Sequence, residues 1–381
     1  MAQGGRRIVA LMLALLALAS CRPQPQVHFF AEGQPQRLSQ WQLLTLQDQR
    51  LRLNPGVLPY DLNSPLFSDY ALKLRTVWMP QGQAAQYREN ETFEFPVGTI
   101  ISKTFYYALP QGARWDGGLV ARQAPEDGGL QDETLDLRRV RLIETRLLVR
   151  REQGWLALPY VWNDEQNDAV LQRAGALLPL QLIDAQGQRE EVAYQVPDQN
   201  QCAGCHATDN RSRQIAPIGP KARHLNRDFD YADGRENQLL RWSRSGYLDG
   251  APEAGQAPRA ADWTDTHASL DDRARAYLDI NCGHCHSPTG PALTSGMSLD
   301  AATRDRLKLG FCKQPIAAGK GTGGRLYGIV PGDADASILA FRMDSDDPAV
   351  MMPELGRSVI HREGVALIRQ WIEQQQGACD S

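Results

Sequence analysis

Two segments of the chain share the pattern Cys-x-x-Cys-His, which places two thiols and an imidazole within five residues. The segments are Cys202-Ala203-Gly204-Cys205-His206 and Cys282-Gly283-His284-Cys285-His286. At this spacing the two thiols add to the vinyl groups of a porphyrin, and the adjacent histidine becomes the proximal ligand of its iron. The sequence therefore predicts two covalently bound haem c groups, attached through Cys202 and Cys205 and through Cys282 and Cys285. His206 and His286 are the predicted iron ligands.

Two other uses of paired cysteines fit this pattern less well. A thioredoxin-like redox pair does not require a histidine after both motifs. A structural zinc site takes its four ligands from one compact unit, whereas these motifs begin 80 residues apart.

The segments that must position these motifs predict a chain of several domains. Residues 99–107, 140–149 and 154–162 are dense in β-branched and aromatic residues, which is typical of strands. We expect an α+β multidomain protein, with an N-terminal antiparallel β-rich domain over residues 41–196 and a mostly α-helical cytochrome c domain over residues 261–381. Residues 197–260 form the first haem-attachment segment, which can pack with the β domain.

Helical patterns surround the second motif. Residues 271–280 begin with two acids and lead into Cys282, residues 335–343 are helix-like, and residues 363–373 are amphipathic. Residues 164–176 form a further helix candidate in the β-rich part. A helix before the motif and a closing helix resemble a class I cytochrome c, which takes its second axial ligand from a methionine in the loop before the last helix. We predict Met352, because Pro353 stiffens its loop; Met351, Met297 and Met343 are the alternatives.

The sixth ligand of the first haem stays open at this point. The chain has no methionine between His206 and Met297, so the sequence does not predict a nearby methionine as the second axial ligand of the first haem. The candidates are His224, His267 and Met79, or an open or water-bound position. An open iron binds small ligands or activates peroxide, whereas an iron with two protein ligands passes electrons only.

The first 21 residues indicate export and lipid attachment. Arg6 and Arg7 precede an apolar run over residues 8–19, and the sequence Leu18-Ala19-Ser20-Cys21 is similar to a bacterial lipobox. We expect residues 1–20 to be a signal peptide and Cys21 to carry a diacylglycerol, with residues 21–40 as a lipid-anchored tether. The predicted location is the bacterial periplasm, on the inner or the outer membrane. Without Arg6 and Arg7 the net charge changes from −4 to −6.

Cys312 and Cys379 are the cysteines that remain. In the oxidising compartment that export implies, two thiols outside the haem motifs are expected to form a disulfide. This bridge would join the end of the chain to the region after the second motif, and its predicted role is structural.

The overall composition excludes several classes of protein. The 381 residues are 42% hydrophobic and 23% charged, which is unlike an intrinsically disordered chain. The mean hydropathy of −0.44 excludes a polytopic membrane protein. Because Lys and Arg do not exceed Asp and Glu, we expect no nucleic-acid partner.

The chain resembles a family of bacterial dihaem c-type cytochrome lipoproteins of uncharacterised function. The stretches that carry this resemblance are spread along most of the sequence and comprise residues 64–70, 144–146, 201–206, 219–223 and 281–286. More weakly, residues 92–206 resemble the cytochrome P460 and c′-β group, in which a β-sheet precedes the haem motif and a strand lysine can crosslink to the haem. Lys103 has a similar place, and we interpret it as a solvent-facing strand residue.

Two functional hypotheses follow. The first is an electron carrier, in which a His/Met-ligated second haem exchanges electrons with a redox partner protein and the first haem relays them. The acidic mature chain favours a partner with a positively charged surface. The second is a haem enzyme, such as a peroxidase or a small-nitrogen-oxide oxidoreductase, with an open first haem that the second supplies with electrons. The sequence has no visible distal acid–base pair, which favours the carrier.

Overall fold

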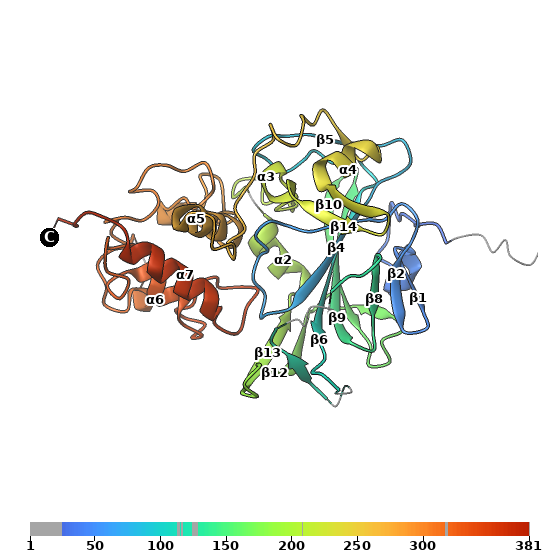
Figure 1. Cartoon of the computed structure of the whole chain (residues 1–381), viewed down its shortest axis with the longest axis horizontal. Helices are drawn as coiled ribbons and strands as arrows, with labels where there is room; N and C mark the ends of the chain where they lie inside the picture. The colour runs from blue at the N-terminus through green and yellow to red at the C-terminus, as the bar shows by residue number, and fades with distance from the viewer. Residues whose placement is uncertain are drawn as a thin grey trace, which may run out of the picture.

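A computed structural model describes residues 25–112, 115, 117–123, 129–207, 209–316 and 319–380. The predicted signal peptide and the lipidation candidate Cys21 lie outside the described residues. Figure 1 shows a β-rich body beside a smaller part that contains α5, α6 and α7. Among the described residues, no helix has the length and apolar character that crossing a membrane would need.

A six-stranded antiparallel sheet forms the centre of the β-rich body. Its strands are ordered β11-β10-β9-β6-β4-β3. Their bounds are β3 Leu58–Tyr60, β4 Leu72–Trp78, β6 Ile100–Ala108, β9 Val140–Arg151, β10 Gly154–Trp162 and β11 Ala169–Leu171. The strands predicted at 99–107, 140–149 and 154–162 are thus confirmed as β6, β9 and β10. The helix predicted at 164–176 is wrong, because this stretch turns back to add β11 beside β10.

One face of this sheet is covered by the N-terminal segment and a small second sheet. The covering elements are the 3-10 helix η1 (Leu38–Trp41) and the strands β1 (Leu44–Gln47), β2 (Arg50–Leu53) and β8 (Thr134–Asp136), in the order β1-β2-β8. Trp41 is fully buried and donates a hydrogen bond from Nε1 to the hydroxyl of Tyr160, 2.8 Å away. Val27, Phe29 and Phe30 pack on the same core, so part of the predicted tether is attached to the β-rich body.

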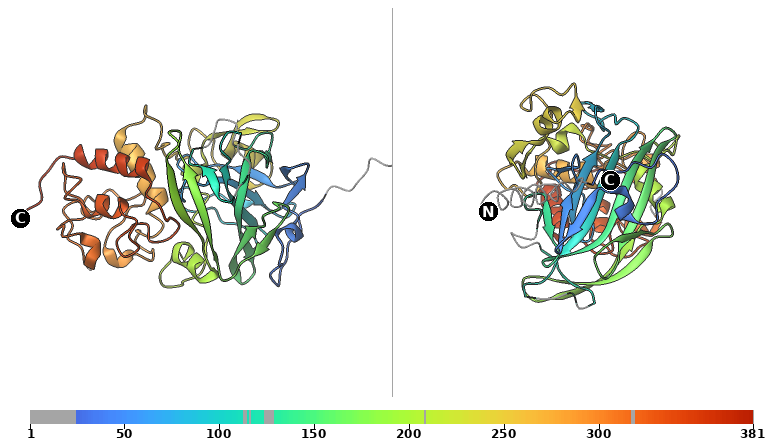
Figure 2. Two further views of the ribbon diagram at one scale, coloured as in Figure 1. Left: turned by 90° about the horizontal axis from the view of Figure 1, so that it is seen from below. Right: turned by 90° about the vertical axis from the view of Figure 1, so that its right-hand side faces the viewer.

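The opposite face carries the elements around the first motif. Figure 2 shows the C-terminal part, in orange and red, at one end of the β-rich body. A three-stranded sheet has the order β13-β12-β7. The other elements come from residues 197–260 and contribute Ala222, Leu239 and Trp242 to a core with Tyr60 and Val77 of the large sheet. The bounds are β5 Ala85–Gln86, β7 Leu119–Ala121, β12 Ala176–Ile183, β13 Arg189–Val196, α2 Gln199–His206, α3 Ala222–Leu225, β14 Asp228–Tyr231, β15 Gly234–Asn237, α4 Gln238–Arg244 and β16 Leu248–Asp249.

The prediction of a mostly α-helical cytochrome c domain is wrong. The described chain is β-rich, with sixteen strands in five sheets and six α-helices. In residues 261–381 the α-helices are α5 (Leu270–Asn281), α6 (Ile338–Met343) and α7 (Arg362–Glu373), with the 3-10 turns η2 (Leu293–Ser295) and η3 (Gly319–Thr322) between them. Long irregular loops fill the rest of this part. The physical reason is the density of glycine and proline between α5 and α7, because both residues disfavour helix interiors.

Helices α5 and α7 nevertheless lie close to the predicted ranges, and their apolar faces share one core. Leu278 of α5 packs with Ile368 and Trp371 of α7 in this core. The indole Nε1 of Trp371 also donates to Asp271 at 2.7 Å. The structure joins Cys312 to Cys379 in a disulfide, which is the pairing that the sequence predicts.

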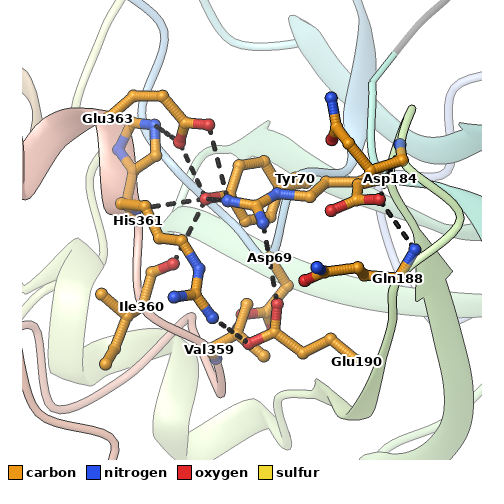
Figure 3. Close-up of polar contacts among 12 residues, drawn as sticks. Asp69, Tyr70, Asp184, Gln188, Glu190, Val359, Ile360, His361 and Glu363 are labelled. Carbon is orange, nitrogen blue, oxygen red and sulfur yellow. Dashed lines mark hydrogen bonds and ion pairs between the residues drawn. The ribbon is translucent and has the colours of Figure 1, made fainter.

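A cluster of polar contacts connects the β-rich body to the C-terminal part (Figure 3). The carboxylate of Asp69 accepts hydrogen bonds from the backbone N–H groups of Ser358, at 2.7 Å, and Val359, at 3.0 Å. The hydroxyl of Tyr70 donates to Glu363 at 2.8 Å. We call this group of contacts the Asp69–Tyr70 clasp. It holds the start of α7 against the loop before β4.

Candidate haem-attachment site

One cavity lies between the large sheet and the C-terminal part, and both Cys-x-x-Cys-His motifs contribute to its wall. Cys202, Cys205 and His206 of the first motif line it, together with Cys282 and His284 of the second. Apolar side chains from β9, β10, α5 and α7 complete much of the lining, and include Leu148, Leu158, Ile280 and Val365. Such a wall suits a flat apolar ring with a few polar edges.

The first motif lies on the short helix α2. Asp198 caps the helix, because its side chain accepts from the backbone N–H groups of Asn200 and Gln201, both at 2.7 Å. Nδ1 of His206 donates to the carbonyl of Ala216 at 3.0 Å, which leaves Nε2 as the nitrogen that can bind iron. Burial, together with the nearby charge of Lys103, lowers the pKa of His206 to about 4, so the ring is neutral and able to ligate.

The second motif continues from the end of α5. Cys282 is the C-cap of this helix, and the backbone N–H of His286 donates to the Cys282 carbonyl at 2.8 Å. Nδ1 of His286 lies 3.1 Å from Oγ of Ser295, and this hydroxyl donates its own proton to the carbonyl of Ala292. The imidazole must therefore be the donor, which again leaves Nε2 for a metal. His286 itself does not line the shared cavity.

The two motifs also approach each other directly. Sγ of Cys285 lies 3.8 Å from the carbonyl oxygen of Gly204, and a hydrogen bond from Cys285 lowers the pKa of Cys205. Gly204 also lies close to Leu355, since a Cβ atom built on this glycine would come within 2.8 Å of a terminal methyl group of that leucine. The four motif cysteines are free thiols. They are thus available for thioether bonds, and the donor set fits two haem c groups.

The loop of residues 351–356 lies between α6 and α7 and contains the predicted ligand Met352. Met352 is half-buried and lines the shared cavity with Cys202 and Cys282. Met343 also lines the cavity, whereas Met351 is buried and Met297 packs on the C-terminal core. Of the alternatives, Met343 is therefore the nearest competitor of Met352. The cavity places Met352 beside both motifs, not beside the second alone.

The three side chains predicted as sixth ligands of the first haem have other environments. His224 lines the cavity, but its Nε2 lies 2.8 Å from the carboxylate of Asp279, to which it is bonded. His267 is on the surface, with 96% of its side chain exposed. Met79 is buried in the core with Trp242 and does not line the cavity. None of these three side chains is therefore a free donor in the cavity.

Sequence reasoning missed two histidines and misjudged one lysine. His284, inside the second motif, lines the cavity, and its buried Nδ1 has no hydrogen-bond partner among the described residues. His361 also lines it and stacks between Phe67, at 4.1 Å, and Tyr277, at 5.5 Å between ring centroids. Lys103 lines the cavity wall and is half-buried, where the sequence predicts a solvent-facing residue. His284 could have been found from the sequence, because it is an extra histidine inside the second motif. The places of His361 and Lys103 depend on tertiary packing.

Comparison with known proteins adds no identification. No family model, curated protein or solved structure matches this chain. Within the described ranges, no three His, Cys, Asp or Glu side chains gather as a protein-only metal site would require. A haem iron needs at most two protein ligands, since the porphyrin supplies the other four.

Proposed function

We propose that this protein is a dihaem c-type cytochrome that transfers electrons in the bacterial periplasm, anchored through lipid on Cys21. The observation that supports this function best is that both attachment motifs contribute cysteines to one cavity, and that outside its lining Cys285 Sγ lies 3.8 Å from the Gly204 carbonyl. Two haems attached there would be close neighbours. When bound, each supplies an iron that cycles between the ferrous and ferric states.

The chain's own residues support this role in three ways. The Nδ1 hydrogen bonds of His206 and His286 fix the tautomer that ligates iron. Much of the cavity lining is apolar, and Met352 offers a thioether that would favour the reduced metal. The acidic mature chain favours a redox partner with a basic surface.

The test is attachment of haem at both motifs. The full chain is produced in a bacterial host with a cytochrome c maturation system, and its mass and haemochrome spectrum are measured. We expect two haems in the wild type and one in each of the double variants Cys202→Ser/Cys205→Ser and Cys282→Ser/Cys285→Ser. The matched control Cys312→Ser/Cys379→Ser, which removes the same number of thiols, retains both haems. A colourless wild type, or one with fewer than two haems, would overturn the proposal.

One observation favours a second function, a haem enzyme with an open first iron. His224, His267 and Met79 are all engaged or distant, so these side chains do not close the sixth position. Carbon monoxide separates the two functions, because it binds ferrous haem only where a position is open. A low-spin spectrum without carbon monoxide binding excludes the enzyme. A high-spin signal that is lost in Cys202→Ser/Cys205→Ser supports it.

A further inference from the structure

Three cations stand side by side in the wall of the shared cavity. The strand register pairs Arg75 of β4 with Lys103 of β6, and Lys103 with Arg146 of β9. Residues directly opposite on adjacent strands share a face of the sheet, so the three side chains form one row. All three line the cavity together with Cys205 and His206. We call Arg75, Lys103 and Arg146 the cationic row.

Such a row is unfavourable unless anions offset it, because like charges placed directly opposite repel each other. Two members have carboxylate partners. Arg75 pairs with Asp61 at 2.6 Å, and Arg146 donates from Nε to Glu144 at 2.8 Å. Glu144 is fully buried and is also bonded by the hydroxyl of Tyr194, so its oxygens are already used.

Lys103 lacks such a partner. Among the described residues its amine makes no ion pair, and its closest stabilising contact is with the ring of Phe105, 5.1 Å from the centroid. Lys73, the next residue on the same face of β4, is likewise without an ion pair and donates only to the carbonyl of Ala71. Burial and the charges of Arg146 and Arg75 lower the pKa of Lys103 to about 7.

The charges around the row therefore do not balance. In the cavity wall the three cations of the row have two carboxylate partners, Asp61 and Glu144, and Asp61 also pairs with Arg227 at 3.6 Å. Lys103 is the member of the row without a carboxylate partner, and because its side chain is partly buried in the wall, the lack of counter-charge is costly. A ligand that carries a carboxylate would supply the missing counter-charge. A haem c group carries two, its propionates, on the ring edge away from the vinyl groups.

We propose that the cationic row binds the propionate carboxylates of the haem attached at Cys202 and Cys205, with Lys103 as the principal partner. The inference rests on the proposed function and assigns the orientation of that ring: its thioether edge is at α2 and its carboxylate edge is against β4, β6 and β9. Arginine and lysine form strong charge-assisted hydrogen bonds with carboxylates, and such bonds fix the plane of the ligand. Lys103 is thus a positioning residue, distinct from the iron ligand His206.

The test compares Lys103→Gln with Lys103→Arg in the full dihaem protein. Removing a positive charge near the iron stabilises the ferric state, so Lys103→Gln lowers the midpoint potential of one haem and shifts its propionate bending bands in resonance Raman spectra. Lys103→Arg restores both. The matched control Lys308→Gln, on an exposed residue, changes neither.

Three results would contradict part of this scheme, and they are distinguishable. Absence of haem from the wild type overturns the proposed function. Two attached haems with unchanged potentials and Raman bands in Lys103→Gln overturn only the assignment of the row. If nitrite or sulfite shifts the wild-type spectrum, and Lys103→Gln abolishes that shift without changing the potential in anion-free buffer, the row binds a free anion instead, which also overturns the assignment.

Discussion

The two motif histidines are prepared as ligands by single hydrogen bonds. Nδ1 of each donates to a protein oxygen, so the lone pair of Nε2 is left for a metal. The pKa of each ring is lowered to about 4, mainly by burial and to a smaller extent by nearby positive charge, and the imidazole is therefore neutral. At the residue scale, the two Cys-x-x-Cys-His motifs can be recognised from the sequence alone. The hydrogen-bond acceptors of their histidines, Ala216 and Ser295, could not be recognised in this way.

The axial role of Met352 gives a prediction at the residue scale. Met352→Ala should lower the midpoint potential of one haem, because a thioether ligand stabilises ferrous iron. The check is a spectroelectrochemical titration of the dihaem protein. Met351→Ala serves as the control: Met351 is buried outside the cavity lining, so its loss should cost about 2–5 kcal/mol of stability and leave both potentials unchanged. An unchanged potential in Met352→Ala would move the assignment to Met343.

A buried ion pair behind the second motif gives a prediction on pH. Asp279 accepts from Arg223 at 2.8 and 2.9 Å and from His224 at 2.8 Å. Burial raises the pKa of Asp279, but these hydrogen bonds outweigh it and hold the pKa well below the ordinary value. A lowered folded-state pKa stabilises the protein above the unfolded-state value of about 3.9, and this stabilisation is lost as the pH falls below it.

Asp279→Asn should therefore cost about 3–5 kcal/mol near neutral pH, because it leaves the Arg223 charge buried without a counter-charge. Urea unfolding at pH 7 and pH 3.5 checks this, and the difference between variant and wild type should shrink at the lower pH. Asp265→Asn, which alters an exposed Asp–His pair, is the control and should change little. A cost that is the same at both pH values would contradict the ionic explanation.

At the scale of elements, sequence patterns located strands and helices better than they located what lies between them. The strands β6, β9 and β10 and the helices α5 and α7 follow from β-branched runs or 3.6-residue periodicity, which are local properties. Residues 164–176 show where this fails: their composition permits a helix, but pairing of β11 with β10 decides the outcome. The irregular loops between α5 and α7 show no periodic pattern of hydrophobic residues, so their course could not be predicted. The cavity, and Lys103 within it, depend on strand register and could not be derived from composition.

The disulfide gives a prediction at the element scale. The Cys312–Cys379 bridge closes a loop with a sequence separation of 67 and attaches the segment after α7 to the loops. Cys379→Ser should cost about 4 kcal/mol by the chain-entropy model and increase proteolysis after Glu373. Both haems should stay attached, because the bridge is separate from the motif cysteines. Thermal unfolding and mass spectrometry check these two outcomes, and loss of a haem would contradict the purely structural role of the bridge.

At the scale of the whole molecule, the shared cavity requires the β-rich body and the C-terminal part to remain together. Its wall takes Lys103 from one part and Val365 from the other. The Asp69–Tyr70 clasp joins the same two parts (Figure 3). The carboxylate of Asp69 accepts from two backbone N–H groups of the C-terminal part. The shared cavity thus depends on contacts that are far from either motif in sequence.

Asp69→Ala should weaken this connection. Each hydrogen bond from a backbone N–H to a charged group contributes about 1.5–3 kcal/mol, so loss of both should lower the urea midpoint clearly. The variant should also separate the unfolding of the two parts, seen as Trp fluorescence and haem absorbance transitions that no longer coincide.

Two control variants separate the hydrogen bonds from backbone strain. Because Asp69 has φ of 49°, part of the cost of Asp69→Ala is backbone strain on alanine. Asp132→Ala, at an exposed residue with φ of 47°, measures that part. Asp69→Asn retains the acceptor oxygen and should fall between wild type and Asp69→Ala. Coincident transitions in Asp69→Ala would mean that the apolar contacts alone hold the two parts together.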